Sequence, residues 1–339
     1  MSRLISRKEM ISLTAAGSVG LGLQAFIPAS SASPFPYETR TTATSANLPG
    51  SASPATPVSG KSSTDTTPVD AAESAHAGRR DLLKGNINHS VCRWTFPFLG
   101  IRELCRVVKE IGFSAIDLVG PADWPVLKQH DVDSSMCNGA EISLTEGWNH
   151  TEYHSTLIKN YTEHIELVAN AGYKNLICFS GNRKGMDDET GLKNCEEGIK
   201  KVLGLAEKNG VVLQMELFNS KINHPDYMCD NTPWGIELCE RIGSPNFVLL
   251  YDIYHMQIGE GDIIRTITDH HTWFGHYHTA GVPGRNEIDD TQELYYPAIM
   301  RTIHRTGFDG YVAQEFISTR ETDAGKITSL AEAIAICDI

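Results

Sequence analysis

The sequence predicts a (β/α)8 TIM barrel that follows an export signal peptide and a disordered linker. Residues 86–339 agree in number with the about 250 residues that are typical of a single eight-fold β/α barrel. Within this range, short apolar runs alternate with longer stretches of helical period, which indicates repeated βα units and a parallel sheet. Eight apolar runs occur. That count is the one a closed barrel requires.

The expected strands are short runs rich in branched and aromatic residues. In chain order they are NHSVCRW (88–94), SAIDLVG (114–120), VDSSMCNG (132–139), NLICFSG (175–181), VVLQMELF (211–218), FVLLYDIYH (247–255), FGHYHTA (274–280) and GYVAQEF (310–316).

The expected helices lie between these strands. They include IRELCRVVKEIGF (101–113), STLIKNYTEHIELVANAGY (155–173), LKNCEEGIKKVLGLAEKNG (192–210), TPWGIELCERIG (232–243) and YPAIMRTIHRTGF (296–308). Several carry a glycine near the end, as helices that stop in a left-handed conformation do. An open doubly wound sheet is the alternative, but no strand is followed by the G-x-G-x-x-G turn of dinucleotide-binding folds.

Residues 1–32 have the organisation of an export signal. A basic start (MSRLISRKEM) precedes an apolar run, and PASSASP offers small residues for cleavage near Ala32. The segment SRKEMI (6–11) resembles a twin-arginine signal with Lys in the second basic position. We therefore predict export to the periplasm, with no stable membrane association after cleavage. A retained membrane anchor is the alternative.

Residues 33–85 are dominated by Ser, Thr, Ala and Pro. They contain too few large apolar side chains to offset the entropy lost on ordering, so we predict a disordered linker. The predicted organisation is thus a signal peptide (1–32), a linker (33–85) and a barrel (86–339).

The charge balance excludes one class of partner. With 29 Lys and Arg against 42 Asp and Glu, the formal net charge is −13, whereas a nucleic-acid surface needs clustered cations. Small polar ligands remain open, and a homo-oligomer is compatible with the composition. The eight cysteines lack CxxC pairs and are expected to be buried thiols.

Polar side chains interrupt the last four predicted strands near their C-terminal ends. Glu216, Asp252, His278 and Glu315 each share a face with the alternate residues before them. Successive members are about one βα unit apart. Because neighbouring strands lie about 4.8 Å apart, the four side chains can converge at the barrel mouth.

Three carboxylates and an imidazole at one point would repel one another and lose hydration, and a bound cation removes that conflict. Oxygen-rich ligation with a single nitrogen favours one divalent ion, Mn²⁺, Mg²⁺ or Co²⁺, over a structural zinc. The alternative is that each residue is an ordinary polar group beside a loop.

Several motifs resemble the hydroxypyruvate isomerase family, within the xylose isomerase-like barrels. They are LLYDIYHMQIGEGD (249–262), PGRNE (283–287) followed by YYPAIM (295–300), and AQEF (313–316). The resemblance covers residues 86 to about 320 and implies that Glu216, Asp252, His278 and Glu315 bind the metal.

The same resemblance assigns roles in catalysis. It implies that Glu216 and Glu315 also act as an acid/base pair, and that His255 and Arg285 contact substrate oxygens. Bacterial hydroxypyruvate isomerases carry Gln where this chain has His278, whereas ketose 3-epimerases of the superfamily carry His. This departure leaves the substrate open between a sugar and a hydroxy-ketoacid.

The predicted function is a metal-dependent isomerase that interconverts a small hydroxy-aldehyde and ketone through an enediolate. A ketose 3-epimerase and a sugar or cyclitol dehydratase are alternatives on the same scaffold. A nuclease is disfavoured by the charge and the ligand count. An exported sugar-binding protein is the alternative of another class, although it would not need two carboxylates beside a cation.

Other polar and aromatic residues are weaker candidates. Trp94 either walls a substrate pocket or packs in the core. Glu141 and Trp148 belong either to a substrate lid or to an ordinary loop. His276 is expected to lie one layer below His278, in a supporting role.

Overall fold

The computed structural model describes residues 83–339. The expected signal peptide and nearly all of the expected linker lie outside these residues. Of the linker's last residues, Lys84 is held against the barrel, because its backbone N–H donates to Asp338 Oδ2 over 2.7 Å.

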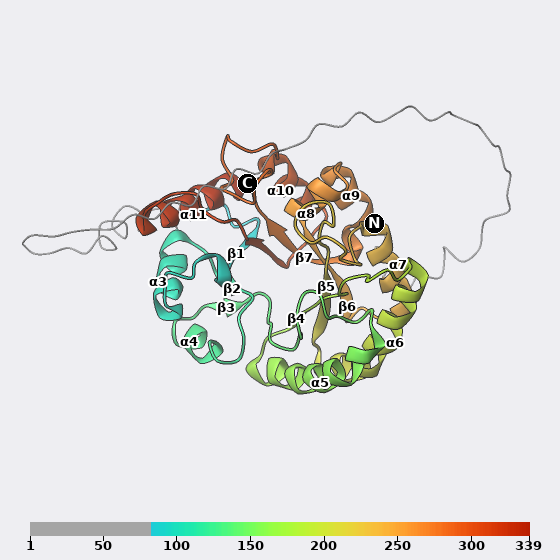
Figure 1. The fold of residues 1–339 in the computed structure, drawn as a ribbon. Coiled ribbons are helices and arrows are strands. Elements are labelled where there is room, and N and C mark those ends of the chain that lie inside the picture. The colour runs from blue at the N-terminus through green and yellow to red at the C-terminus, as the bar shows by residue number, and fades with distance from the viewer. Residues whose placement is uncertain (1–82) are drawn as a thin grey trace, which may run out of the picture. The chain divides into compact units, whose positions relative to one another are not determined.

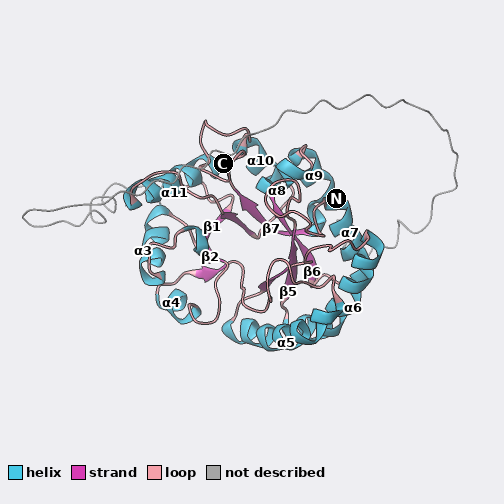
Figure 2. Ribbon diagram, in the orientation of Figure 1, coloured by secondary structure: helices cyan, strands magenta, loops and turns pink. Residues whose placement is uncertain are grey.

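Eight parallel strands form one curled sheet, surrounded by helices (Figures 1 and 2). The strand order is β3-β2-β1-β8-β7-β6-β5-β4. The strands are β1 (Asn88–Cys92), β2 (Ala115–Asp117), β3 (Asp133–Ser134), β4 (Asn175–Cys178), β5 (Val212–Glu216), β6 (Phe247–Asp252), β7 (Phe274–Thr279) and β8 (Tyr311–Gln314). All eight expected strands occur, each shorter than its apolar run.

The two ends of the strand order meet through a single residue after β3. The backbone N–H of Cys137 donates to the carbonyl of Asn175, and the Cys137 carbonyl accepts from Ile177. This parallel bridge connects the segment after β3 to β4. The arrangement is the one expected of a TIM barrel.

The helices cover the outer face of the sheet. They are α3 (Ile101–Ile111), α4 (Trp124–Gln129), α5 (His154–Ala171), α6 (Asp188–Asn209), α7 (Thr232–Ile242), α8 (Ile253–Gly259), α9 (Ile263–His270), α10 (Tyr296–Arg305) and α11 (Asp323–Cys337), with short 3-10 turns at Arg93–Thr95, Thr151–Tyr153 and His271–Trp273. Left-handed glycines such as Gly112 and Gly243 end α3 and α7, as the sequence predicts.

The sixth strand is two elements rather than one. We expected a strand as far as His255, but β6 ends at Asp252 and α8 begins at once. The reason is local, because Asp252 Oδ1 accepts hydrogen bonds from the backbone N–H groups of Tyr254 (2.8 Å) and His255 (3.2 Å). This N-cap starts a helix inside the apolar run.

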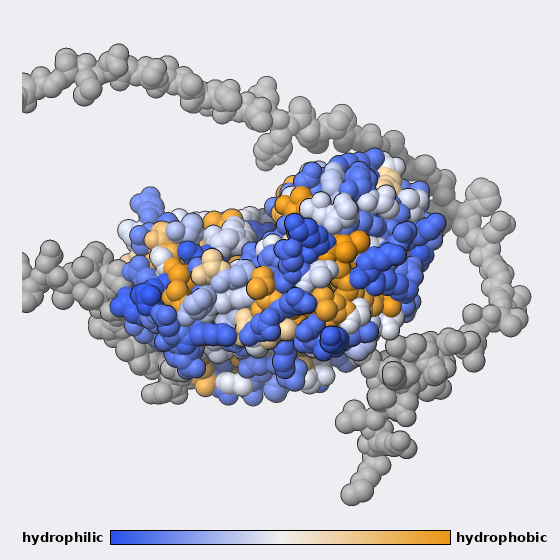
Figure 3. Space-filling view, turned by 90° about the horizontal axis from the view of Figure 1, so that it is seen from below, coloured by the Kyte–Doolittle hydropathy of each residue, from blue (hydrophilic) through white to orange (hydrophobic). Residues whose placement is uncertain are grey.

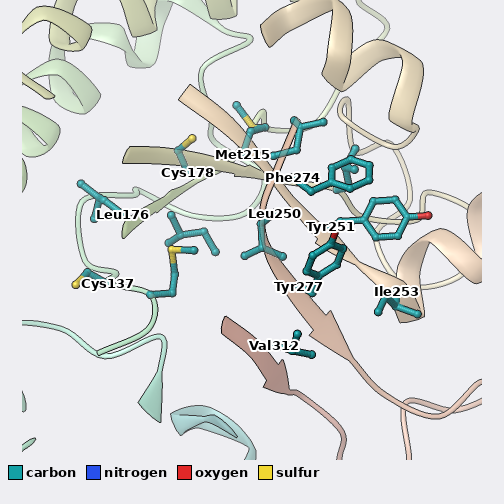
Figure 4. Close-up of a cluster of buried hydrophobic side chains, with 14 of the residues drawn as sticks. Cys137, Leu176, Cys178, Met215, Leu250, Tyr251, Ile253, Phe274, Tyr277 and Val312 are labelled. Atoms are coloured by element: carbon teal, nitrogen blue, oxygen red, sulfur yellow. The ribbon is translucent and has the colours of Figure 1, made fainter. Parts of the chain in front are cut away.

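Apolar side chains fill the barrel wall, as Figure 4 shows for Leu250, Tyr251, Phe274 and Tyr277. Tyr251 and Phe274, on neighbouring strands, have ring centroids 4.4 Å apart. On the face seen in Figure 3, hydrophilic residues predominate and hydrophobic ones form small groups between them. Within residues 83–339, the helices are all too short or too polar to cross a bilayer.

Candidate metal centre and active site

The structure brings Glu216, Asp252, His278 and Glu315 together. Glu216 and Asp252 end β5 and β6, His278 lies in β7, and Glu315 directly follows β8. One ligand atom from each lies within 4.8 Å of the others, and all four side chains are buried.

The register of the strands explains why residues on four strands meet. Glu216 pairs with Leu250, two residues before Asp252, and His278 pairs with Ala313, two residues before Glu315. From β5 to β6, and again from β7 to β8, the candidate ligand therefore lies two residues further along its strand than the residue paired with the previous ligand. Strands of a closed barrel tilt, and the stagger compensates for the tilt, so the four side chains reach one level of the barrel mouth.

Burial and charge shift the pKa values of the four groups in different directions. Burial raises the pKa of Glu216 to about 7 and that of Asp252 to about 6. For Glu315, burial is outweighed by Arg285 and His278, which hold its pKa well below the usual range. For His278, burial is outweighed by nearby groups, chiefly Glu315, and its pKa lies well above the usual value.

The four groups suit a divalent cation. His278 Nδ1 lies 3.0 Å from Glu216 Oε1 and 2.8 Å from Glu315 Oε2. Burial raises the carboxyl pKa values because it removes the charged forms from water, and a cation bound between these groups would offset that penalty. Three carboxylates with one imidazole form a donor set of the hard to borderline kind that Mn²⁺, Mg²⁺ and Co²⁺ accept.

Arg285 reaches this centre from the loop after β7. Its guanidinium forms ion pairs with Asp252 and Glu315. The ring centroids of Trp94 and Tyr254 lie 5.4 Å and 5.3 Å from its Cζ. Arg285 is thus held between two aromatic rings, with its charge directed at two of the candidate ligands.

The loop that carries Arg285 is anchored on both sides. Arg285 has a φ of 59°, which is rare for a residue with a side chain, and its carbonyl accepts from the N–H of Ile317 over 2.7 Å. Two residues later, the buried Glu287 accepts from Ser318 Oγ (2.6 Å) and from the Thr319 backbone (2.7 Å). These contacts fix the loop to the segment after β8.

His255 lies beside Arg285, but on α8 rather than on a strand. Asn219 directs its amide Nδ2 at His255 Nδ1 over 2.6 Å, because its own Oδ1 already accepts the N–H groups of Ile222 and Asn223. Burial lowers the pKa of His255, which is therefore neutral. A neutral ring that accepts at Nδ1 carries its hydrogen on Nε2.

That hydrogen faces a second donor, since Arg285 Nη1 lies 2.9 Å from His255 Nε2. Two donors this close repel one another unless an acceptor lies beside both. Asp252 Oδ2 is such an acceptor, because it lies 3.5 Å from His255 Nε2 and 3.3 Å from Arg285 Nη2.

Trp94, a weaker candidate in the sequence, contacts the site directly. Trp94 lies in the short 3-10 turn after β1, and its Nε1–H donates to Glu315 Oε1 over 2.8 Å. Trp148 is fully buried and packs against Tyr161 with ring centroids 5.1 Å apart, so it is not part of an exposed lid. Glu141 accepts the N–H of Gly139 within its own loop.

Asp117 and Asn219 also belong to the site, although neither was predicted from the sequence. Asp117 ends β2 and is fully buried. His278 Nε2 lies 3.0 Å from its Oδ1, and His276 Nε2 lies 2.9 Å from its Oδ2. A signal was present, because Asp117 interrupts an apolar run just as Glu216 and Asp252 do. Asn219 lies outside any strand, and its sequence context carries no comparable signal.

Comparisons with known proteins place the chain in a family. Over 129 residues the chain is 29% identical to a putative hydroxypyruvate isomerase of Homo sapiens, a match that covers 38% of this chain and about half (47%) of the human protein. Over 258 residues it is 25% identical to hydroxypyruvate isomerase of Escherichia coli, covering 72% of this chain and 97% of that protein.

A solved structure has a similar fold. D-psicose 3-epimerase of Clostridium cellulolyticum H10, with D-tagatose, aligns with a TM-score of 0.60 and 14% identity, covering 75% of this chain and all of that chain (100%). The family description that matches residues 105–335 is the xylose isomerase-like TIM barrel. Since this match spans more than half of the chain, the protein belongs to the xylose isomerase-like TIM barrel family.

Proposed function

We propose that the protein is a metal-dependent isomerase that interconverts a small hydroxy-aldehyde and ketone, in the manner of a hydroxypyruvate isomerase. The observation that carries the proposal is the convergence of Glu216, Asp252, His278 and Glu315, whose ligand atoms lie within 4.8 Å of one another. Relatives named hydroxypyruvate isomerase support the reaction class.

In this proposal, one divalent ion is bound by the four residues and supplies Lewis acidity toward the carbonyl and hydroxyl oxygens of the substrate. A cation would also offset the loss of hydration on burial that raises the pKa values of Glu216 and Asp252. Mn²⁺, Mg²⁺ and Co²⁺ all suit the donor set.

Glu216 and Glu315 act as the acid/base pair. One carboxylate takes the proton from the carbon beside the carbonyl, which leaves an enediolate, and returns it to the adjacent carbon. A positioned acid or base typically contributes roughly 10²–10⁴-fold to the rate. Asp252 differs from both glutamates, because its Oδ1 accepts from the backbone at the start of α8 and so has a structural role.

His255 and Arg285 hold the substrate oxygens. His255 Nε2 and the Arg285 guanidinium lie side by side next to the four candidate ligands, with Nη1 2.9 Å from Nε2. Together they stabilise the negative charge that develops on an oxygen during proton removal. Arg285 also suits the carboxylate of a hydroxy-ketoacid, because a guanidinium matches a carboxylate in shape and charge.

A ketose 3-epimerase is the second candidate. His278 favours it, because ketose 3-epimerases carry His where bacterial hydroxypyruvate isomerases carry Gln. In epimerisation, one carboxylate removes the proton and the other returns a proton to the opposite face of the same carbon. The two reactions differ only in where the proton returns.

Deuterium incorporation tests the proposal. Candidate hydroxy-ketoacids and ketoses are incubated with the protein and Mn²⁺ in D₂O, and the products are followed by NMR. An isomerase exchanges hydrogen at the two carbons between which the carbonyl moves, which are C1 and C2 of a 2-ketose and C2 and C3 of a 3-hydroxy-2-ketoacid. A ketose 3-epimerase instead places deuterium at C3 of the ketose and inverts that centre. Loss of water would indicate a dehydratase. If no compound exchanged hydrogen while binding persisted, the protein would be a binding protein instead.

Export remains part of the proposal. An exported enzyme would meet products of carbohydrate breakdown outside the cytoplasm rather than intermediates of central metabolism. Fractionation of cells that express the full chain, with and without residues 1–32, tests the location. Recovery of both forms from the cytoplasm would contradict export.

A further inference from the structure

Asp117 sits directly behind the candidate metal centre, with its carboxylate surrounded by hydrogen-bonding groups. It ends β2 on the barrel interior and has no exposed surface. Ser135 Oγ donates to its Oδ2 over 2.6 Å, and Cys92 Sγ lies 3.6 Å from its Oδ1. The imidazole nitrogens of His276 and His278 complete the set at 2.9 Å and 3.0 Å.

A carboxylate oxygen accepts hydrogen bonds, so Ser135 Oγ and His278 Nε2, which lie 2.6 Å and 3.0 Å from Oδ2 and Oδ1 of Asp117, each present a hydrogen to it. The contact with Asp117 therefore keeps a hydrogen of His278 on Nε2.

The other ring nitrogen of His278 faces the opposite way. Nδ1 lies 3.0 Å from Glu216 Oε1 and 2.8 Å from Glu315 Oε2. A neutral imidazole with its hydrogen on Nε2 presents a lone pair at Nδ1. Only this tautomer offers a ligand atom to the space that the carboxylates share.

We propose that Asp117 is a positioning residue for the metal ligand His278, with its carboxylate fixing both the orientation of the ring and the tautomer that binds a cation through Nδ1. The proposal rests on the proposed metal site. Carboxylates that orient a ligating histidine in this way typically change metal affinity by roughly 10–100-fold when they are removed.

His276 has a supporting part in the same arrangement. It lies 2.9 Å from Asp117 Oδ2 and meets the His278 ring edge-on, with centroids 5.3 Å apart. It thus contacts both partners and restricts the movement of each. The alternative is that Asp117, His276 and His278 hold a second cation of their own, since their ligand atoms also lie within 4.8 Å of one another.

The test is Mn²⁺ titration of the metal-free protein, with the free ion measured by electron paramagnetic resonance. The unchanged protein is expected to bind one equivalent, and Asp117→Asn to bind one equivalent with a Kd roughly 10–100-fold higher. Asp131→Asn is the matched control, because it removes the same charge from a side chain that is 97% exposed. Asn also tolerates the positive φ of 53° at this position. This control is expected to bind like the unchanged protein.

The outcomes separate the two proposals. Failure of the unchanged protein to bind Mn²⁺ would overturn the metal site and this role with it. Equal affinity in Asp117→Asn and the unchanged protein would overturn only the role of Asp117. Two equivalents in the unchanged protein, with one lost in the variant, would show a second cation site instead.

A measurement on the unchanged protein covers the case in which Asp117→Asn does not fold. Nitrogen NMR of the Mg²⁺-loaded protein reports the tautomer of each histidine, and His278→Gln identifies the signal of His278. The expected result is a hydrogen on Nε2 and none on Nδ1. A hydrogen on Nδ1 would overturn the proposal.

Discussion

The Nε1–H of Trp94 donates to Oε1 of Glu315 over 2.8 Å, which ties a ring that is 44% exposed to a buried carboxylate. The same ring lies over Arg285, which pairs with the other oxygen of Glu315. Glu315 is therefore oriented from two sides. One of its partners reaches solvent.

Trp94→Phe removes the N–H and keeps the apolar ring. A hydrogen bond to a charged group is worth about 1.5–3 kcal/mol, and partial exposure reduces this to about 1 kcal/mol, so kcat/KM is expected to fall roughly fivefold. Trp94→Ala separates the two contributions. If Phe behaved like Trp while Ala lost activity, the ring and not the hydrogen bond would matter.

Glu216→Gln and Glu315→Gln are expected to lower kcat by roughly 10²–10⁴-fold even at saturating Mn²⁺, because each removes an acid/base group. Initial rates of deuterium exchange measure the effect. Glu141→Gln is the control, since this carboxylate is engaged within its own loop. A comparable loss in Glu141→Gln would move the acid/base role to the loop after β3.

Asn219→Asp is expected to reverse the tautomer of His255. In the unchanged protein, His255 Nδ1 accepts from the Asn219 amide. In the variant, the new carboxylate would accept a hydrogen from Nδ1, and Nε2 would lose the hydrogen that is proposed to contact the substrate. Loss of such a donor typically costs roughly 10²–10³-fold in kcat. Steady-state kinetics and the nitrogen NMR shifts of His255 together test this. Normal kinetics with a reversed tautomer would remove His255 from the proposed chemistry.

Mn²⁺ is expected to raise Tm more at pH 8 than at pH 5. In the metal-free protein, the pKa of Glu216 is raised from 4.5 to about 7 and that of Asp252 from 3.8 to about 6. A raised carboxyl pKa means that the folded state binds the proton more tightly, so stability is lost as pH rises through this window. A bound cation removes that penalty. Melting curves with Mn²⁺ and with EDTA, from pH 5 to 8, give the difference. A shift that was the same at every pH would contradict the expectation.

All eight cysteines are buried thiols, and they are expected to react slowly with a thiol reagent until the protein unfolds. Burial raises the pKa of Cys137 to about 12 and that of Cys92 well above 9.0, so little of the reactive thiolate is present. Ellman's reagent should detect eight thiols only in denaturant. Rapid reaction in the native protein would show that part of the barrel opens.

The prediction of the fold depended on features that are local in the chain. Alternation of apolar runs and helical stretches identified all eight strands. The end of the sixth strand was wrong because Asp252 caps α8, and a side-chain cap inside an apolar run is not visible in the apolar pattern. The brief helices α4 and α9 and the C-terminal α11 were not among the expected helices.

The set of candidate ligands could be predicted because each strand alternates with a period of two. A carboxylate on the inner face of a buried strand, such as that of Glu216 or Asp252, is unusual and therefore noticeable. Asp117 interrupts its strand in the same way. Its part in the site was not predicted, because β2 and β7 are far apart in the sequence and only the barrel brings Asp117 into contact with His278.

The family motifs, the eight strands and the four convergent side chains follow from local pattern in the chain, because strand periodicity and the parallel order depend on it. The folded barrel is needed to show which ring nitrogen of His278 faces the carboxylates, that Asn219 contacts His255 Nδ1, and that Trp94 and Arg285 both contact Glu315. These contacts join residues far apart in the chain. They depend on the tilt and stagger of a closed barrel, which no short segment of sequence records.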